Sequence, residues 1–192
     1  MARLLRTIRR QTAGPLRRLT PSEHRRVHGF LTRLPYYRPS VEIIAAAGPR
    51  ARNWHAASFL PHRHMVLDPA LLARRRELAR ILYHEIFHFV WARLGNPVRH
   101  GFEEVLRREW EEHARGELGW SAESCKLGLS RRDLARRSRR WRHYVCESFC
   151  DSAAWLCLTG RPDHPEWSLK PRFRSRRRQW FLTADVLPRL RL

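Results

Sequence analysis

Two histidines and a glutamate stand in the pattern HExxH, at His84, Glu85 and His88. They lie inside an apolar run, residues 81–91, which favours a helix. On a helix, residues four apart lie about 40° apart in projection and one turn along the axis, so both imidazoles can reach one metal ion. A zinc ion there would acidify water, and the Glu85 carboxylate would take the proton during attack on a carbonyl carbon. The motif therefore predicts a hydrolytic zinc centre, because a helix that buried these groups without a metal would have to pair them with each other.

A catalytic zinc ion needs a third protein ligand, and the sequence narrows the choice. In the extended pattern HExxHxxGxxH, a glycine and a histidine would fall where the chain has Trp91 and Leu94, so that version is excluded. The strongest candidate lies in a second helix-like stretch, residues 144–156, where Glu147 and Asp151 would share one face. The alternative is an amphipathic helix that presents both carboxylates to solvent.

The HExxH motif and the ExxxD pair together resemble the gluzincin class of metallopeptidases, and similar helices occur in ImmA/IrrE-like peptidases. The resemblance covers these two helices. It implies a zincin-like fold, Glu147 as the third zinc ligand, and Asp151 behind a ligand histidine, His84, whose tautomer its carboxylate would fix.

A rival third ligand is His100, which follows the helix-terminating sequence of residues 95–97. This segment resembles the SprT-like proteases, in which a loop with a His-Gly pair follows HExxH and supplies the third imidazole. The chain has no accompanying zinc-ribbon cysteine pairs. A surface-loop histidine is the alternative interpretation of His100.

Amide hydrolysis also needs a donor for the developing oxyanion. His143 and Tyr144 precede Glu147 by four and three residues, so a continuous helix would place them on the same side. Other possible donors are Tyr83, His113 and Arg142.

The chain has 192 residues and a formal net charge of +21, and Lys126 and Lys170 are the only lysines among its 39 basic residues. Such a charge attracts polyanions non-specifically. The run 136–142, with Trp141 among arginines, is the most typical of nucleic-acid contact. A solvated helix face is the favoured interpretation, since no helix-turn-helix or zinc finger accompanies the run, and codon bias explains part of the arginine content.

The four cysteines, Cys125, Cys146, Cys150 and Cys157, form no CxxC pair. Three of them recur at helical spacing, as small buried residues do, and a thiolate ligand is the less favoured alternative. The chain has no apolar stretch of the roughly 20 residues that span a bilayer, and no signal-type apolar segment. We therefore expect a soluble, reduced, cytoplasmic protein without a transmembrane segment; its oligomeric state stays open.

Hydrophobic periodicity predicts a helix-rich α+β fold: a basic, disordered arm over residues 1–20 and a single zincin-like domain over 21–192. A small sheet would form from strands at 41–45 and 64–67 and lie above the active-site helix. Helices are expected at 21–34, from Asp68 to near Leu94, from 101 to about 116–119, and from Ser130 to Leu158. Acidic residues such as Glu103 and Glu104 are expected at the surface.

These observations predict a zinc-dependent metallopeptidase, with His84, His88 and Glu147 as ligands and Glu85 as the general base. Its partner would be a peptide or protein substrate. The alternatives are a SprT-like DNA-associated protease that uses His100, and a non-catalytic basic protein that binds nucleic acid.

Overall fold

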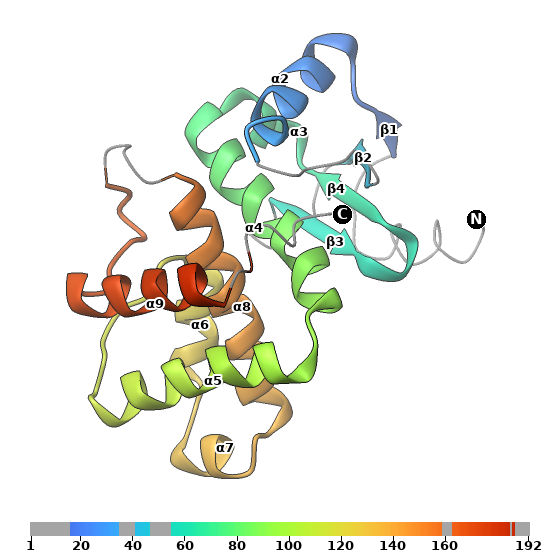
Figure 1. The fold of residues 1–192 in the computed structure, drawn as a ribbon. Coiled ribbons are helices and arrows are strands. Elements are labelled where there is room, and N and C mark those ends of the chain that lie inside the picture. Colours follow the sequence, from blue (N-terminus) through green and yellow to red (C-terminus); the bar gives the residue numbers. More distant parts are fainter. Residues whose placement is uncertain (1–15, 35–40, 47–54, 159–162, 185, 187–192) are drawn as a thin grey trace. The chain divides into compact units, whose positions relative to one another are not determined.

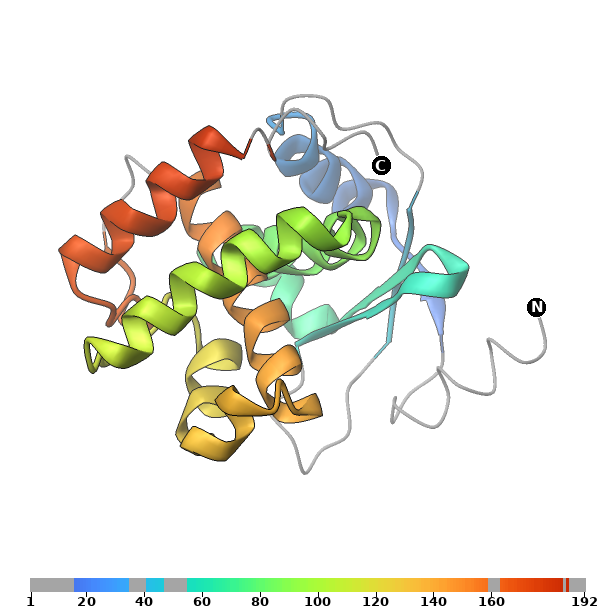
Figure 2. The same ribbon diagram turned by 60° about the horizontal axis from the view of Figure 1, so that its bottom comes forward.

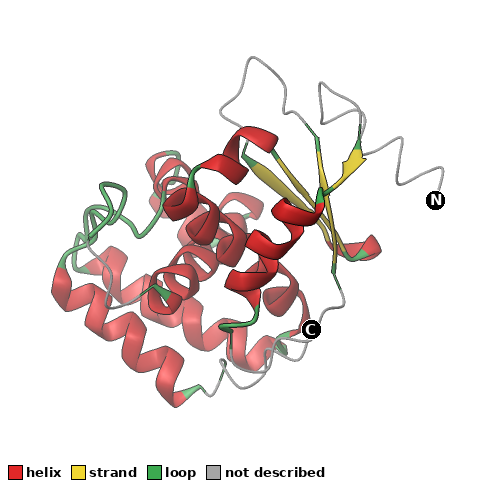
Figure 3. Ribbon diagram, turned by 90° about the horizontal axis from the view of Figure 1, so that it is seen from above, coloured by secondary structure: helices red, strands yellow, loops and turns green. Residues whose placement is uncertain are grey.

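The computed structural model describes residues 16–34, 41–46, 55–158, 163–184 and 186 (Figure 1). It is rich in helix and contains one small mixed sheet, which confirms the predicted α+β class (Figure 3). Contacts divide the described residues into two compact units, a first unit up to Phe89 and a second unit from Val90 onward. None of the helices in the described ranges has both the length and the apolar character needed to cross a membrane. A single zincin-like domain over 21–192 stays a prediction.

The first unit contains a four-stranded sheet in the order β1-β2-β4-β3. The strands are β1 (Arg17–Arg18), β2 (Glu42–Ala45), β3 (Ala56–Phe59) and β4 (His64–Leu67). β2 and β4 are parallel, whereas β1 pairs with β2 and β3 pairs with β4 in antiparallel fashion. The strands predicted at 41–45 and 64–67 are confirmed. Arg17 and Arg18, expected in a basic arm, belong to the sheet; residues 1–15 of that arm lie outside the described residues.

The register of the sheet separates its two faces. Ile43, Met65 and Ser58 are partners across β2, β4 and β3, so they share one face. The opposite face carries Ile44, Val66 and Phe59, which pack in one hydrophobic cluster. β3 is the edge strand on its side of the sheet, and its outer edge pairs with no described strand.

Helix α2 (Pro21–Leu31) confirms the helix predicted over 21–34 and ends slightly earlier, at a cap formed by Thr32. Its start is a capping box: Thr20 accepts a hydrogen bond from the Glu23 amide, and the Glu23 carboxylate accepts one from the Thr20 amide at 2.8 Å. Hydrogen bonding to Arg17 lowers the pKa of Glu23 to about 2. The helix N-terminus is thus fixed by groups that lie next to it in sequence.

Two helices replace the long helix predicted from Asp68 to Leu94. Asp68 does cap a helix, and its carboxylate accepts from the Ala70 amide at 2.8 Å. That helix, α3 (Pro69–Ala73), is short, because Arg74 leaves helical geometry at ψ 84°. α4 (Arg75–Arg93) follows and carries the HExxH motif. Within the first unit, Tyr83 of α4 donates a hydrogen bond to the main-chain oxygen of Phe30 at 3.0 Å, which joins α4 to α2.

The second unit is helical. Its helices are α5 (Asn96–Glu111), α6 (Trp120–Leu127), α7 (Arg131–Ala135), α8 (Arg139–Cys157) and α9 (Pro171–Thr183). The helix end expected near Leu94 is confirmed, since α4 ends at Arg93, but the loop expected around His100 is wrong, because Asn96 and Pro97 begin α5. The single helix expected from Ser130 to Leu158 is divided, since Arg137 takes a positive φ of 45° and Ser138 caps a new helix.

An aromatic cluster forms the centre of the second unit. α5, α8 and α9 contact one another and lie side by side in Figure 2. Between them, Phe149 of α8 stacks on Phe181 of α9 with ring centroids 5.1 Å apart, and Phe102 of α5 meets both rings edge-on. The helix that carries Glu147 and Asp151 is therefore held by large buried rings.

Candidate metal and catalytic residues

His84 and His88 converge on one face of α4. Their Nε2 atoms lie 3.1 Å apart, and the two rings meet at 80° with centroids 4.8 Å apart. His84 is buried and His88 is half-buried. The sequence predicted this convergence from the spacing alone, and the structure confirms it.

The separation of the two nitrogens suits a shared metal ion. Zinc binds imidazole nitrogen at about 2.0–2.1 Å in tetrahedral geometry, which places two such nitrogens roughly 3.3 Å apart. The observed Nε2–Nε2 distance of 3.1 Å is close to that value. The Nε2–Nε2 separation is therefore compatible with a shared zinc ion, and without a metal the two imidazoles hydrogen-bond to each other.

Glu85 is directed towards the edge strand of the sheet. The Ser58 hydroxyl on β3 donates to the Glu85 carboxylate, with Oγ and Oε2 2.5 Å apart, and lies 3.0 Å from the Glu85 main-chain oxygen. The Glu85 side chain is 8% exposed. β3 and α4 are thus joined at the residue that the motif assigns to proton transfer, and sequence reasoning gave no role to Ser58.

Glu147 lies on α8 in the second unit and is 9% exposed. Its Oε1 atom is 3.3 Å from Nε2 of His143, one turn earlier. Nδ1 of the same imidazole is 3.3 Å from Sγ of Cys125 on α6. Hydrogen bonds to Cys125 and Glu147 raise the pKa of His143 above its usual value, which favours the imidazolium next to this carboxylate.

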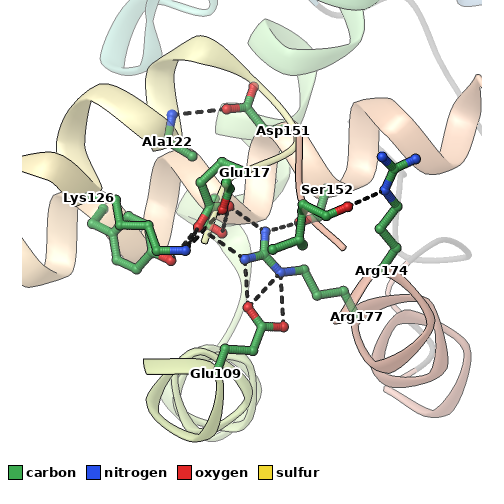
Figure 4. A network of polar contacts seen from close by, with 12 residues as sticks. Glu109, Glu117, Ala122, Lys126, Asp151, Ser152, Arg174 and Arg177 are labelled. Carbon is green, nitrogen blue, oxygen red and sulfur yellow. Dashed lines mark hydrogen bonds and ion pairs between the residues drawn. The ribbon is translucent and has the colours of Figure 1, made fainter. Parts of the chain in front are cut away.

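Asp151 is buried on the same face of α8, one turn after Glu147. Its Oδ2 atom accepts a hydrogen bond from the Ala122 amide at 3.0 Å, in the first turn of α6 (Figure 4). Gly119, which precedes that helix, has no side chain, and a Cβ atom there would overlap the Asp151 carboxylate. Asp151 thus caps α6 in place of a side chain at position 119.

The close approach of Gly119 to Asp151 leads to a prediction. We expect Gly119→Ala to lower the free energy of unfolding by about 1–3 kcal/mol, because the added methyl group must displace a buried carboxylate. Urea unfolding followed by tryptophan fluorescence measures the change. Gly128→Ala is the matched control, since its Cβ would meet the Cys125 main-chain oxygen at an ordinary 3.7 Å. Equal stability of the two variants would contradict the capping role of Asp151.

The hydroxyl of Tyr144 is engaged in another hydrogen bond and is therefore not available to an oxyanion. It donates to Oε1 of Glu117 at 2.6 Å, and the tyrosine is buried. Glu117 is fully buried and also pairs with Arg177 and Lys126, at 2.7 Å and 2.9 Å (Figure 4). These cations hold the pKa of Glu117 at about 2 despite its burial. Of the two predicted donors, the Tyr144 hydroxyl belongs to a structural network, and both ring nitrogens of His143 lie next to other side chains, those of Glu147 and Cys125.

His100 lies in a basic environment within the second unit. It is exposed near the start of α5 and lines a pocket of about 350 Å³ together with Arg99, Arg137 and Arg142. Neighbouring guanidinium groups repel a metal cation. The carboxylate in the same pocket, that of Glu103, is engaged by Arg137 at 2.7 Å. Among the described residues, the groups of side chains suited to a metal ion do not include His100.

Glu103 corrects the expectation that the acidic residues of α5 lie at the surface. It is 4% exposed, and its carboxylate accepts hydrogen bonds from Arg107, Arg137 and the Trp141 indole. Trp141 is itself fully buried, so its ring is closed to a nucleic-acid base. Part of the basic run 136–142 therefore stabilises the fold rather than facing a partner.

No known protein family, curated protein or solved structure matches the chain.

Proposed function

We propose that this protein is a zinc-dependent metallopeptidase that hydrolyses peptide bonds. The observation that carries the proposal is the convergence of His84 and His88, whose Nε2 atoms are 3.1 Å apart on the helix that also bears Glu85. Glu85 is adjacent to His84 in sequence, and its buried carboxylate is oriented by Ser58.

Glu147 is the third ligand in this proposal. Glu147 would add one carboxylate oxygen to the two imidazole nitrogens of His84 and His88, a donor set that catalytic zinc sites use. Asp151 would stand behind His84 and fix its tautomer, as the resemblance to gluzincins implies. A thiolate ligand from Cys146 or Cys150 is the alternative, and sulfur-rich donor sets are typical of closed structural sites.

Zinc, when bound, supplies a Lewis acid that polarises the peptide carbonyl and makes water acidic. Glu85 takes a proton from the attacking water and delivers it to the leaving amine. Ser58 is a positioning residue, because its hydroxyl donates to Glu85 Oε2 and limits the orientations of that carboxylate. His143, predicted as an oxyanion donor, has its two ring nitrogens next to Glu147 and Cys125, so in this proposal it would position the Glu147 carboxylate.

The peptide substrate would bind along β3 in this proposal. β3 is an edge strand whose outer edge pairs with no described strand, and main-chain groups on such an edge can pair with an extended peptide. Ser58 on this strand contacts Glu85, so a peptide paired with β3 would run close to the proposed base. The four cysteines form no disulfide, which fits the cytoplasmic location that we propose.

Peptide hydrolysis before and after removal of the metal tests this proposal. We expect the purified protein to cleave a library of internally quenched peptides, to lose that activity in a chelator, and to regain it with one equivalent of zinc. Hydrolysis that persists unchanged after complete removal of zinc would contradict the proposed chemistry.

A further inference from the structure

Four arginines gather around one pocket in the first unit, apart from the proposed catalytic residues. The pocket has a volume of about 540 Å³ and lies between α2 and the start of α4. Its basic residues are Arg25, Arg26, Arg33 and Arg75. No aspartate or glutamate is among the described residues that line it. The pocket is therefore positively charged without an internal counter-ion.

Contacts with uncharged groups orient three of these guanidinium groups without neutralising them. Arg26 donates a hydrogen bond to the main-chain oxygen of Leu72, a neutral acceptor. Arg33 and Arg75 lie over the ring of Phe30, with distances from Cζ to the ring centroid of 5.9 Å and 6.0 Å. Like charges brought together in this way repel one another, and that cost is relieved when an anion binds among them.

The pocket is also open where a ligand would approach. Gly29, part of its lining, has no side chain, and a Cβ atom built there would have no atom within 4 Å. α4 begins at Arg75, so the positive end of that helix adds to the field of the side chains.

We infer that this pocket binds a phosphate group. Arginine forks match phosphoryl oxygens in geometry and charge, and several of them at one site are typical of phosphate recognition. The ligand is a free phosphate compound or the phosphodiester of a nucleic-acid strand, which share this chemistry. The inference does not depend on the proposed zinc chemistry, because none of the lining residues belongs to that site.

Titration calorimetry with pyrophosphate tests the site in the full-length chain. We expect Arg33→Gln to weaken binding by about tenfold or more, because a charge-assisted hydrogen bond is lost. Arg132→Gln is the matched control: it removes the same charge from an exposed position on α7 and should change the affinity less than twofold. Similar losses in both variants would show attraction by net charge alone and would overturn the inference.

Gly29 offers a second test that removes no arginine. Gly29→Glu places a carboxylate at the open position, and Gly29→Gln places a neutral side chain of the same size there. We expect Glu to weaken pyrophosphate binding at least about tenfold more than Gln, with circular dichroism confirming that both variants are folded. Equal affinity of the two variants would exclude the pocket as the binding site.

A short single-stranded oligonucleotide distinguishes the two sources of phosphate. If pyrophosphate binds and both Gly29→Glu and Arg33→Gln weaken that binding, the ligand of the pocket is a free phosphate compound. If pyrophosphate does not bind but the oligonucleotide does, and the same two substitutions weaken its binding, the ligand is the phosphodiester of a nucleic-acid strand. Failure of both probes to bind wild type at low salt would refute the site.

Discussion

Replacing Glu85 by glutamine is expected to lower kcat/KM for peptide hydrolysis by about 10²–10⁴-fold and to leave the zinc content unchanged. Glutamine has nearly the same shape but cannot accept the proton of the attacking water. It can still accept the hydrogen bond from Ser58, so the local structure should persist. Activity is measured on the quenched-peptide library, and zinc content by plasma mass spectrometry.

Glu111→Gln is the control for this variant, because Glu111 is an exposed residue of α5 outside the proposed site. It should retain nearly full activity. If Glu85→Gln retained wild-type activity with zinc bound, Glu85 would not be the base. Loss of zinc together with activity would instead show that Glu85 supports the metal site.

The buried network around Arg177 leads to the second large effect. Arg177 is fully buried on α9 and pairs with Glu109 and Glu117, each at 2.7 Å (Figure 4). We expect Arg177→Met to lower the free energy of unfolding by about 3–5 kcal/mol, because two carboxylates lose their shared cation inside the protein. Urea unfolding followed by tryptophan fluorescence measures the loss.

Arg178→Met is the matched control, since Arg178 is the next residue on α9 and is exposed. It should change stability by less than about 0.5 kcal/mol. A loss in Arg177→Met as small as in the control would mean that water or a rearranged Lys126 replaces the guanidinium. The network would then contribute little to the fold.

Contacts between residues that are close along the chain could be predicted from the sequence. The spacing of His84 and His88 on an apolar run predicted their convergence, because helix geometry alone determines which side chains meet four residues apart. The pairing of Thr20 with Glu23 follows from the same local geometry.

Helix boundaries were harder to predict where the same residues are common both after the end of a helix and in the first turn of the next. Asn96-Pro97 correctly indicated the end of α4 at Arg93, but proline is equally suited to a first turn, and α5 begins at Asn96 instead of a loop. Ser130 capped a helix as expected, but the second cap residue, Ser138, was overlooked, and it follows the break at Arg137, which adopts a positive φ and pairs with Glu103. That pairing is set by contacts distant in the sequence.

Roles that depend on distant contacts could not be read from residue type. Ser58 lies in a short strand with little β-branched character, so nothing in the sequence linked it to Glu85. Arg177 lies in a run of arginines, a pattern that is typical of a solvated helix face. A signal was present, however, because Phe173, Arg177 and Phe181 recur every four residues and both phenylalanines are buried, which places Arg177 on an inward stripe.

The most direct test of the central claim is the zinc content of wild type, Glu147→Ala and His100→Ala after dialysis against a mild chelator. We predict one zinc per chain in wild type and in His100→Ala, and loss of zinc in Glu147→Ala, because Glu147 is the proposed third ligand. Cys150→Ser, measured in parallel, should keep its zinc. Loss with His100 alone would favour a SprT-like site. A folded wild-type protein that takes up no zinc on reloading would contradict the metallopeptidase proposal.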